Sequence, residues 1–331
     1  MERTGVLVIS TVSDLATDRV IDILHQRSVP ILRLNTEDFP YRKYISWWID
    51  TDKKASCLNV DREIHSPKKM RSIWYRRFRS PASPPKCDES LHKYVVNEAF
   101  ATFRGIITAH FGGNRWMSLP AKIEAAELKP YQLQVARKLG FSIPSTLISS
   151  DPIAIKDFFL NHEGDVIAKP VRSGYIEVAN GSFGMYTRKL TTEDIQFLEM
   201  ALPCPIIVQK EIPKEFDIRV TVVGRKIFAV AIDSQTDPEA QIDWRRTENP
   251  DLPHQIHKLP VRLKNLIISL IHELDLSFAA IDLILTPEGE YFFLEVNPSG
   301  QWLWVEDKTG LPISDAVADW LEGSDEINRN Y

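Results

Sequence analysis

The segment AAIDLILTPEGEYFFLEVNPSG, residues 279–300, constrains the fold most, because polar side chains interrupt two apolar runs. Asp282 lies in the first run, and Glu295 and Asn297 lie at the end of the second. The turn sequence TPEGE between the runs predicts a hairpin of two antiparallel strands. Side chains alternate along a strand, so Glu295 and Asn297 share a face, and pairing would place Asp282 next to them.

This constellation of side chains predicts a cation site. Carboxylates in apolar strands need compensation, because a buried unpaired charge is costly. Two carboxylates and an amide oxygen suit a hard cation such as Mg²⁺, which usually shares its ligands with substrate phosphates. The alternative is that Asp282 and Glu295 occupy exposed strand ends and that Asn297-Pro298 forms a turn.

Composition excludes several classes of protein. The chain has 331 residues, 44% of them hydrophobic, and a net charge of −5 from 40 basic and 45 acidic residues. This mild charge does not favour nucleic acid or an anionic membrane as the main partner. No signal peptide or membrane-spanning run is recognised, so we expect a cytoplasmic protein. The three cysteines are scattered, which argues against a disulfide framework or a zinc site.

The order of expected elements predicts a mixed fold with three parts. Residues 5–39 read as a strand, a helix and a second strand, which is an α/β opening. Residues 122–140 read as a helix with Gly140 as C-cap, and further strands and helices follow in α+β style. We therefore expect an N-terminal α/β domain (1–117), a central subdomain (118–205) and a C-terminal subdomain (206–331).

Basic residues in three segments support a phosphate-binding site near the predicted hairpin. Lys169 ends the predicted strand DVIAKP and precedes a loop that contains glycines, and Lys129 begins a helix. Each lysine alone is more simply explained as a solvated surface residue. Arg219 lies inside the apolar strand FDIRVTVVG and needs an anion for its donors, of which the simplest is Asp217.

Together these motifs resemble the ATP-grasp ligases. The matching elements, in chain order, are Lys129, VIAKP, QKEIPKEFDIRVTVVG (209–224), AAIDLIL and LEVNPSG. The resemblance implies an ATP-grasp fold behind an N-terminal α/β domain, with ATP and two Mg²⁺ ions as cofactors. The roles it implies are phosphate binding by Lys129 and Lys169, an adenine hinge at Gln209, Lys210, Glu211 and Ile212, ribose binding by Asp217, phosphate or acyl-phosphate contact by Arg219, and metal binding by Asp282, Glu295 and Asn297.

Within this superfamily, the chain resembles the enzymes that macrocyclise microviridins and related graspetides, which are ribosomally made peptides. The stretches that carry this likeness include SIWYRRFR, AIDSQTDPEAQIDWRR and LEVNPSGQWLWVE. The resemblance implies that Asp or Glu side chains of a precursor peptide are activated as acyl phosphates and then joined to Ser or Thr hydroxyls as esters. Amides with Lys, formed on the same class of peptide, remain an alternative, and a homodimer is common among these enzymes.

One position departs from the broader superfamily. D-alanine ligases carry an arginine two residues before the metal-binding Asp, and this chain has Ala280 there. The missing cation would come from Arg219 or Arg245, which sequence does not decide. The segment 172–190 is the expected lid that would keep water from the acyl phosphate.

Recognition of the peptide is expected away from the chemistry. The resemblance implies that a helical leader docks on the helix TTEDIQFLEMA, opened by Glu193 and Asp194, and on the strands FDIRVTVVG and KIFAVAID. The alternative role of the two acids is to stabilise the start of their own helix. The segment KKMRSIWYRRFR has six basic residues in twelve, and we expect Arg76 or Arg77 to face an acidic core peptide.

Two other functions remain open at this point. One is an ATP-grasp ligase that joins small amino-acid substrates. The other is a binding protein that keeps nucleotide affinity without catalysis, which the complete set of cations and predicted metal ligands disfavours.

Overall fold

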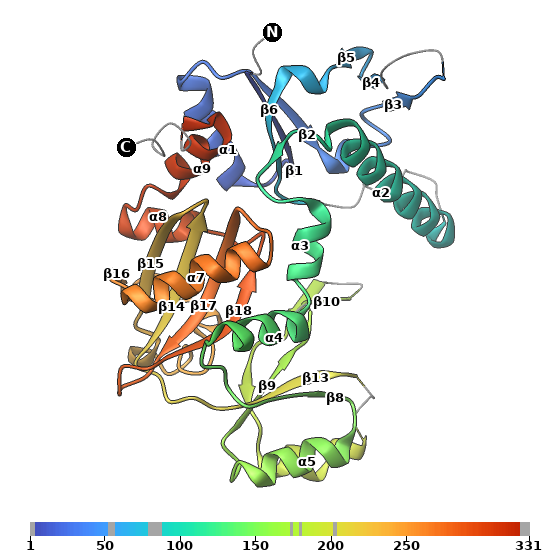
Figure 1. Cartoon of the computed structure of the whole chain (residues 1–331). Helices are drawn as coiled ribbons and strands as arrows, with labels where there is room; N and C mark the ends of the chain where they lie inside the picture. Colours follow the sequence, from blue (N-terminus) through green and yellow to red (C-terminus); the bar gives the residue numbers. More distant parts are fainter. Residues whose placement is uncertain are drawn as a thin grey trace.

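The computed structural model describes residues 4–51, 57–78, 88–172, 175–178, 181–200 and 204–324. These residues form a parallel sheet at the N-terminus, a small central sheet, and a larger antiparallel sheet (Figure 1). Among them, no helix has the length and apolar character needed to cross a membrane.

The N-terminal domain is built around the strand β1 (Gly5–Ser10), as its apolar sequence predicted. Its sheet has the order β2-β1-β6-β7, and all three pairings are parallel. Val6 and Val8 pack on one face of this sheet, while Leu7 and Ile9 pack on the other. Both faces of the sheet are therefore covered, which explains an apolar run without alternation. The other strands are β2 (Ile31–Asn35), β6 (Met70–Tyr75) and β7 (Arg115–Trp116).

Helices from both ends of the chain cover this sheet. The helix α1 (Leu15–Gln26) lies on one face together with the C-terminal helix α9 (Ile313–Glu322), and α2 (Glu89–Phe111) lies on the opposite face. A separate antiparallel sheet consists of β3 (Ile45–Trp48), β4 (Cys57–Val60) and β5 (Glu63–His65). The helix α9 is thus part of the N-terminal domain's core.

The predicted helix over 122–140 is two helices, α3 (Pro120–Ala126) and α4 (Lys129–Leu139). The break occurs because Pro130 lies in the first turn of α4, where it lacks a backbone N–H, and in a continuous helix its ring would clash with the carbonyl four residues earlier. Gly140 ends α4 with φ 96°, which confirms the predicted C-cap. The helix α8 (Leu303–Thr309) precedes α9 in the chain.

The central subdomain is a four-stranded sheet of order β12-β9-β13-β8. The helices α5 (Pro152–Asn161) and α6 (Thr192–Gln196) pack against it through an apolar cluster that includes Phe159 and Ile195. The strands are β8 (Thr146–Ser149), β9 (Val166–Pro170), β12 (Arg188–Lys189) and β13 (Ile206–Lys210), and a hairpin of β10 (Tyr175–Val178) and β11 (Gly181–Gly184) stands apart.

The C-terminal subdomain is a five-stranded antiparallel sheet of order β16-β15-β14-β17-β18. One face packs on α4 and α7 (Val261–Glu273), and the other contributes Val223, Val230 and Phe278 to the cluster that holds α1 and α9. The strands are β14 (Phe216–Val223), β15 (Lys226–Ile232), β16 (His254–Ile256), β17 (Phe278–Leu285) and β18 (Tyr291–Asn297).

The division at 117/118 and 205/206 stays a prediction about folding units. The helices α3 and α4 pack on the C-terminal sheet, and β13, which follows the second boundary, pairs within the central sheet. The chain therefore crosses between the sheets more often than a linear division implies.

A glycine substitution tests the cap of the helix that carries Lys129. A Cβ on Gly140 meets nothing within 4 Å, so Gly140→Ala costs stability only through the positive φ of 96°. We expect the free energy of unfolding to fall by about 1–2 kcal/mol. Gly113→Ala is the control, because that site is equally open and needs no positive φ, and it should leave stability unchanged or slightly raised. Equal effects in denaturant unfolding would contradict this assignment.

Candidate active site

The hairpin of β17 and β18 brings the predicted acidic residues together. The strands are antiparallel, and Asp282 lies opposite Glu295, while Ala280 lies opposite Asn297. The tight turn between them contains Gly289 at φ 84°. The sequence prediction that these side chains are neighbours is confirmed.

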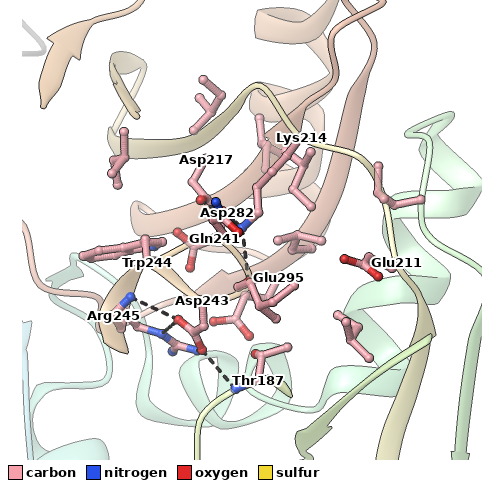
Figure 2. Close-up of a pocket in the computed structure, with 18 of the residues that line it drawn as sticks. Thr187, Glu211, Lys214, Asp217, Gln241, Asp243, Trp244, Arg245, Asp282 and Glu295 are labelled. Carbon is pink, nitrogen blue, oxygen red and sulfur yellow. Dashed lines mark hydrogen bonds and ion pairs between the residues drawn. The ribbon is translucent and has the colours of Figure 1, made fainter. Parts of the chain in front are cut away.

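A cavity of about 210 Å³ lies beside this hairpin, between the central and C-terminal sheets (Figure 2). Lys169 of β9, Arg219 of β14 and the carboxylates of Asp282 and Glu295 all border it. The remaining wall comes from 211–214 and from the loop that follows β15. Charged groups from β9, β14 and the hairpin therefore line one cavity.

Glu295 is neutralised by lysine. Lys129 donates from Nζ to Oε2 of Glu295 at 2.8 Å, and both side chains are mostly buried. Burial alone would raise the pKa of Glu295, but the charges of Lys129 and Lys169 outweigh it and lower that pKa. Glu295 is therefore an anion at neutral pH.

Lys169 differs from Lys129, because its ammonium has no hydrogen bond or ion pair with the described residues. Burial lowers its pKa, and the nearby charge of Glu295 acts in the opposite direction. An ammonium that borders a cavity without a protein partner is suited to an anionic ligand.

Arg219 pairs across the sheet with Asp282. Its Nη1 lies 2.7 and 2.9 Å from the two carboxylate oxygens of Asp282, and its Nη2 donates to the carbonyl of Gln301 at 3.1 Å. The simple alternative that Arg219 pairs with Asp217 is wrong, because Asp217 accepts from Lys214 and Ser234 instead. Register explains the outcome, since Arg219 lies directly opposite Asp282 on β17.

The alanine at position 280 is explained by a close backbone approach. A Cβ on Gly300 would lie 2.3 Å from the Cβ of Ala280 and 3.2 Å from Nη2 of Arg219. The loop after β18 thus occupies the space beside position 280, and the guanidinium of Arg219 lies in the same place. An arginine at position 280 would not fit beside this loop.

Arg245 also borders the cavity, where it forms a two-point ion pair with Asp243. The distances are 2.8 Å from Nε to Oδ1 and 2.7 Å from Nη2 to Oδ2. This contact raises the pKa of Arg245 and, against the effect of burial, lowers the pKa of Asp243 to about 2. Asp243 also accepts from the backbone N–H of Thr187, which belongs to the expected lid segment 172–190. Gly174 of that segment lies outside the described residues.

The predicted adenine hinge is only partly at the cavity. Glu211 and Ile212 line it, whereas the side chain of Gln209 is buried and donates to Thr146, and Lys210 is exposed. Asp217 lines the cavity, and burial raises its pKa. Asn297 is not among the lining residues, and its side-chain oxygen accepts from the backbone N–H of Ser299 at 3.0 Å.

Sequence reasoning missed most of the loop that closes the cavity. The segment 235–245 supplies several polar side chains, and Lys214 supplies another, but only Arg245 was predicted. The available signal was the density of polar residues directly after the buried strand β15. The missed lining residues are Thr187, Lys214, Gln235, Gln241, Asp243 and Trp244.

The residues fit a hard cation shared with phosphates rather than a closed metal site. Among the described residues, no group of three or more His, Cys, Asp or Glu side chains converges. Asp282 and Glu295 supply two carboxylates, each paired with a basic side chain. Such a pair needs oxygen ligands from a substrate to complete the coordination of Mg²⁺.

Three residues predicted to bind peptide, Arg77, Glu193 and Asp194, do not line this cavity. The Nε of Arg77 lies 3.7 Å from Asp14, and its side chain is 39% exposed. Asp194 completes the capping box of α6 and pairs with Arg188, so the helix-stabilising role is confirmed for Asp194. These contacts lower the pKa of Asp194. The helix α6 packs on the central sheet, whereas the strands β14 and β15 belong to the C-terminal sheet.

Glu193 and Asp194 border a second, larger cavity of about 770 Å³. Its rim includes exposed apolar side chains of Met185, Tyr186 and Phe197, with exposed fractions of 48%, 40% and 54%. Exposed apolar groups next to acidic ones are typical of surfaces that bind a partner.

Lys169 has no partner among the described residues and Lys214 is paired with Asp217, so replacing each of them should affect the free energy of unfolding differently. Lys169→Met removes an unpaired, partly buried charge, so the free energy of unfolding at pH 7 should stay the same or rise by up to about 1 kcal/mol. Lys214→Met leaves the buried carboxylate of Asp217 without its cation and should cost about 3 kcal/mol. Denaturant unfolding of both variants measures the difference.

The pH dependence supplies the control for this prediction. The folded-state pKa of Lys169 is lowered, so the unfolded chain binds this proton more tightly, and stability from this group rises with pH towards 10.5. Lys169→Met should lack that rise. A loss of stability in Lys169→Met equal to that in Lys214→Met would contradict the assignment of Lys169 as unpaired.

Comparison with known proteins identifies the family. Residues 5–123 match the family described as the MvdD pre-ATP grasp domain. No curated protein matches the sequence. A Chryseobacterium gregarium RiPP-associated ATP-grasp ligase, solved with ADP and a leader and core peptide, is similar with a TM-score of 0.88 and 27% identity over 97% of each chain.

Two macrocyclases from Microcystis aeruginosa MRC are also similar. MdnC, bound with the precursor peptide MdnA, has a TM-score of 0.84 and 29% identity, and MdnB has a TM-score of 0.79 and 30% identity. Each alignment covers 96% of this chain and 99% of the macrocyclase. The fold with its pre-ATP-grasp domain, and identity of this level over whole chains, agree with the resemblance found in the sequence. This chain therefore belongs to the ATP-grasp ligases of ribosomally made peptides, the family of the macrocyclases MdnB and MdnC.

Proposed function

We propose that this protein is an ADP-forming ligase that activates Asp or Glu side chains of a ribosomally made precursor peptide and joins them to Ser or Thr hydroxyls as esters. The observation that supports this most is the convergence of cations on the carboxylates of Asp282 and Glu295. The cations are Lys129, Lys169 and Arg219. A binding protein without catalysis would not need both this pair of carboxylates and an unpaired lysine in one cavity.

The cavity has the features needed for a nucleotide. Apolar side chains, including Ile212, Ile232 and Leu283, line one part of it and suit a flat base. The carboxylate of Asp217 suits the ribose hydroxyls. Lys169 lies towards the carboxylate end, where it would meet phosphate oxygens.

Asp282, Glu295 and Asn297 would hold Mg²⁺, with two ions as the proposed number. The bound metal would neutralise charge on the phosphates. In the structure, Arg219 neutralises the carboxylate of Asp282, and Lys129 neutralises that of Glu295. Binding of Mg²⁺ and ATP would therefore release Arg219 and Lys129 towards the phosphates.

The proposed reaction has two steps. An Asp or Glu carboxylate of the peptide attacks the γ-phosphorus of ATP, so that a C–O–P bond forms and ADP leaves. A Ser or Thr hydroxyl of the same peptide then attacks the acyl carbon, inorganic phosphate leaves, and the hydroxyl proton is lost to solvent or base. Each crosslink removes the elements of one water from the peptide. Arg219 is the proposed cation for the acyl phosphate, because its partner Asp282 would instead bind Mg²⁺, whereas the partner of Arg245 is Asp243, which is not a proposed metal ligand.

The protein's contribution is positioning and charge neutralisation. An acyl phosphate hydrolyses if water reaches it, so the lid segment has a specific role. Thr187 of this segment is tied by its backbone N–H to Asp243, which also holds Arg245. We infer that closure of the lid is coupled to the position of Arg245.

The second cavity is the proposed site for the leader of the precursor. Phe197 and Glu193 on its rim combine an apolar anchor with negative charge. Such a surface suits an amphipathic helix with a basic face. Arg77 is proposed to face the acidic core of the peptide, because its side chain is partly exposed.

Intact mass spectrometry tests the reaction. A precursor peptide encoded beside this protein's gene is incubated with the protein, ATP and Mg²⁺, and the expected result is the loss of one or more waters. Mild base should cleave the esters, whereas amides formed with Lys would survive. Asp282→Ala is the control and should lower turnover by at least about 100-fold.

Unchanged peptide mass would contradict the proposal. If ADP were then released only on addition of free amino acids, the protein would be a ligase of small substrates. A variant Asp282→Ala that still removed water from the peptide would contradict the proposed role of this carboxylate.

Two substitutions should separate leader binding from chemistry. Arg77→Ala should lower turnover by about tenfold or more and change leader affinity by less than about twofold, because Arg77 follows β6 of the N-terminal sheet, whereas α6 packs on the central sheet. Phe197→Ala should weaken leader affinity by about tenfold, as loss of an aromatic anchor does, and leave turnover at saturating peptide nearly unchanged. Fluorescence anisotropy with a labelled leader and an ADP-release assay measure both. The same pattern in both variants would contradict the separation.

A further inference from the structure

Arg76 is a buried arginine in the N-terminal domain that contacts the loop after the active-site strand β18. It directly follows β6, and only 2% of the residue is exposed. Its Nη1 donates to the carbonyl of Ser299 at 2.5 Å, and its Nη2 donates to the carbonyl of Gly300 at 3.1 Å and to Oε1 of Gln301 at 3.2 Å. One guanidinium therefore binds three consecutive residues of the loop.

The guanidinium of Arg76 is fixed from its other side. Its Nε lies 3.4 Å from the carboxylate of Asp14, which is fully buried at the start of α1. Its planar group lies over the ring of Trp302 at 4.6 Å. Burial lowers the pKa of Arg76 to about 9, so the group remains charged at neutral pH. A planar fork held between an acid, a ring and three acceptors has little freedom to move.

The loop that Arg76 holds carries groups of the proposed active site. Asn297, a proposed metal ligand, accepts a hydrogen bond from the backbone of Ser299. Arg219, the partner of Asp282, donates to the carbonyl of Gln301. The backbone of Gly300 packs directly against β17 at Ala280. Movement of this loop would change the positions of Asn297 and Arg219 together.

We propose that Arg76 is a positioning residue, through which the N-terminal domain fixes the loop 297–301 and orients Asn297 and Arg219 for Mg²⁺ and the phosphates. This inference rests on the proposed function in that nucleotide and Mg²⁺ bind in the cavity. Outer-shell groups that orient metal ligands commonly change metal affinity by 10–100-fold when they are altered. A role limited to holding the domains together would instead lower stability and leave the Mg²⁺ dependence of the folded protein unchanged.

The test is the Mg²⁺ dependence of ADP binding, measured by titration calorimetry on the full chain. Arg76→Lys keeps the charge beside Asp14 but removes the fork that binds three acceptors. We expect ADP affinity without Mg²⁺ to stay within about twofold of the wild type, and the half-saturating Mg²⁺ concentration to rise by about tenfold.

Arg115→Lys is the matched control. Arg115 also lies in the N-terminal sheet, lies 3.7 Å from an indole centroid, that of Trp320, and donates to a backbone carbonyl, but its partner is α9 rather than the loop 297–301. It should lose stability as Arg76→Lys does and keep the Mg²⁺ dependence of the wild type. An equal rise in both variants would overturn the inference.

Gln301→Ala decides the outcome if Arg76→Lys does not fold. It removes one of the three acceptors at a partly exposed position and should raise the half-saturating Mg²⁺ concentration by about two- to threefold. If Gln301→Ala folds and keeps the Mg²⁺ dependence of the wild type, the inference about Arg76 is overturned, while the proposed function stands. A wild-type protein that binds no Mg²⁺ with ADP would overturn the proposed function and the inference with it.

Discussion

The ion pairs across β14, β17 and β18 are the interactions on which the site depends. Asp282 lies between Arg219 on one neighbouring strand and Glu295 on the other, so two carboxylates and a guanidinium share one sheet. Buried carboxylates this close would repel each other without compensation, and Arg219 and Lys129 supply it. The same carboxylates and basic side chains have the charges needed to bind Mg²⁺ and the phosphates of a nucleotide.

The position of Arg219 requires the loop after β18 to lie close to β17. The loop after β18 must pass close to β17 so that Gln301 meets Arg219, and the contact between Gly300 and Ala280 allows it. A larger residue at either position would separate the strand from the loop. The N-terminal domain contacts the same loop through Arg76, and α9 packs beside α1 in that domain. The active site is therefore assembled from both ends of the chain.

Sequence patterns predicted the parts of the fold that follow from local rules. The apolar runs of β1 and β18 predicted these strands, and the two-residue period of a strand predicted that Glu295 and Asn297 share one face. Pro130 marks the first turn of α4, yet the surrounding apolar pattern predicted one continuous helix through this position. The partner of Arg219 could not be predicted, because the pairing of β14 with β17 joins residues 63 positions apart in the chain. The loop 235–245 was missed for the same reason, since its residues meet the cavity only through the tertiary fold.

The most direct test of this account is a crystal structure of the protein with ADP and Mn²⁺, whose anomalous scattering locates the metal. The account predicts metal density at about 2.0–2.2 Å from carboxylate oxygens of Asp282 and Glu295, with Arg219 and Lys129 moved towards phosphate oxygens. Density held by phosphates alone, with Arg219 still paired to Asp282 and Lys129 to Glu295, would contradict the central claim.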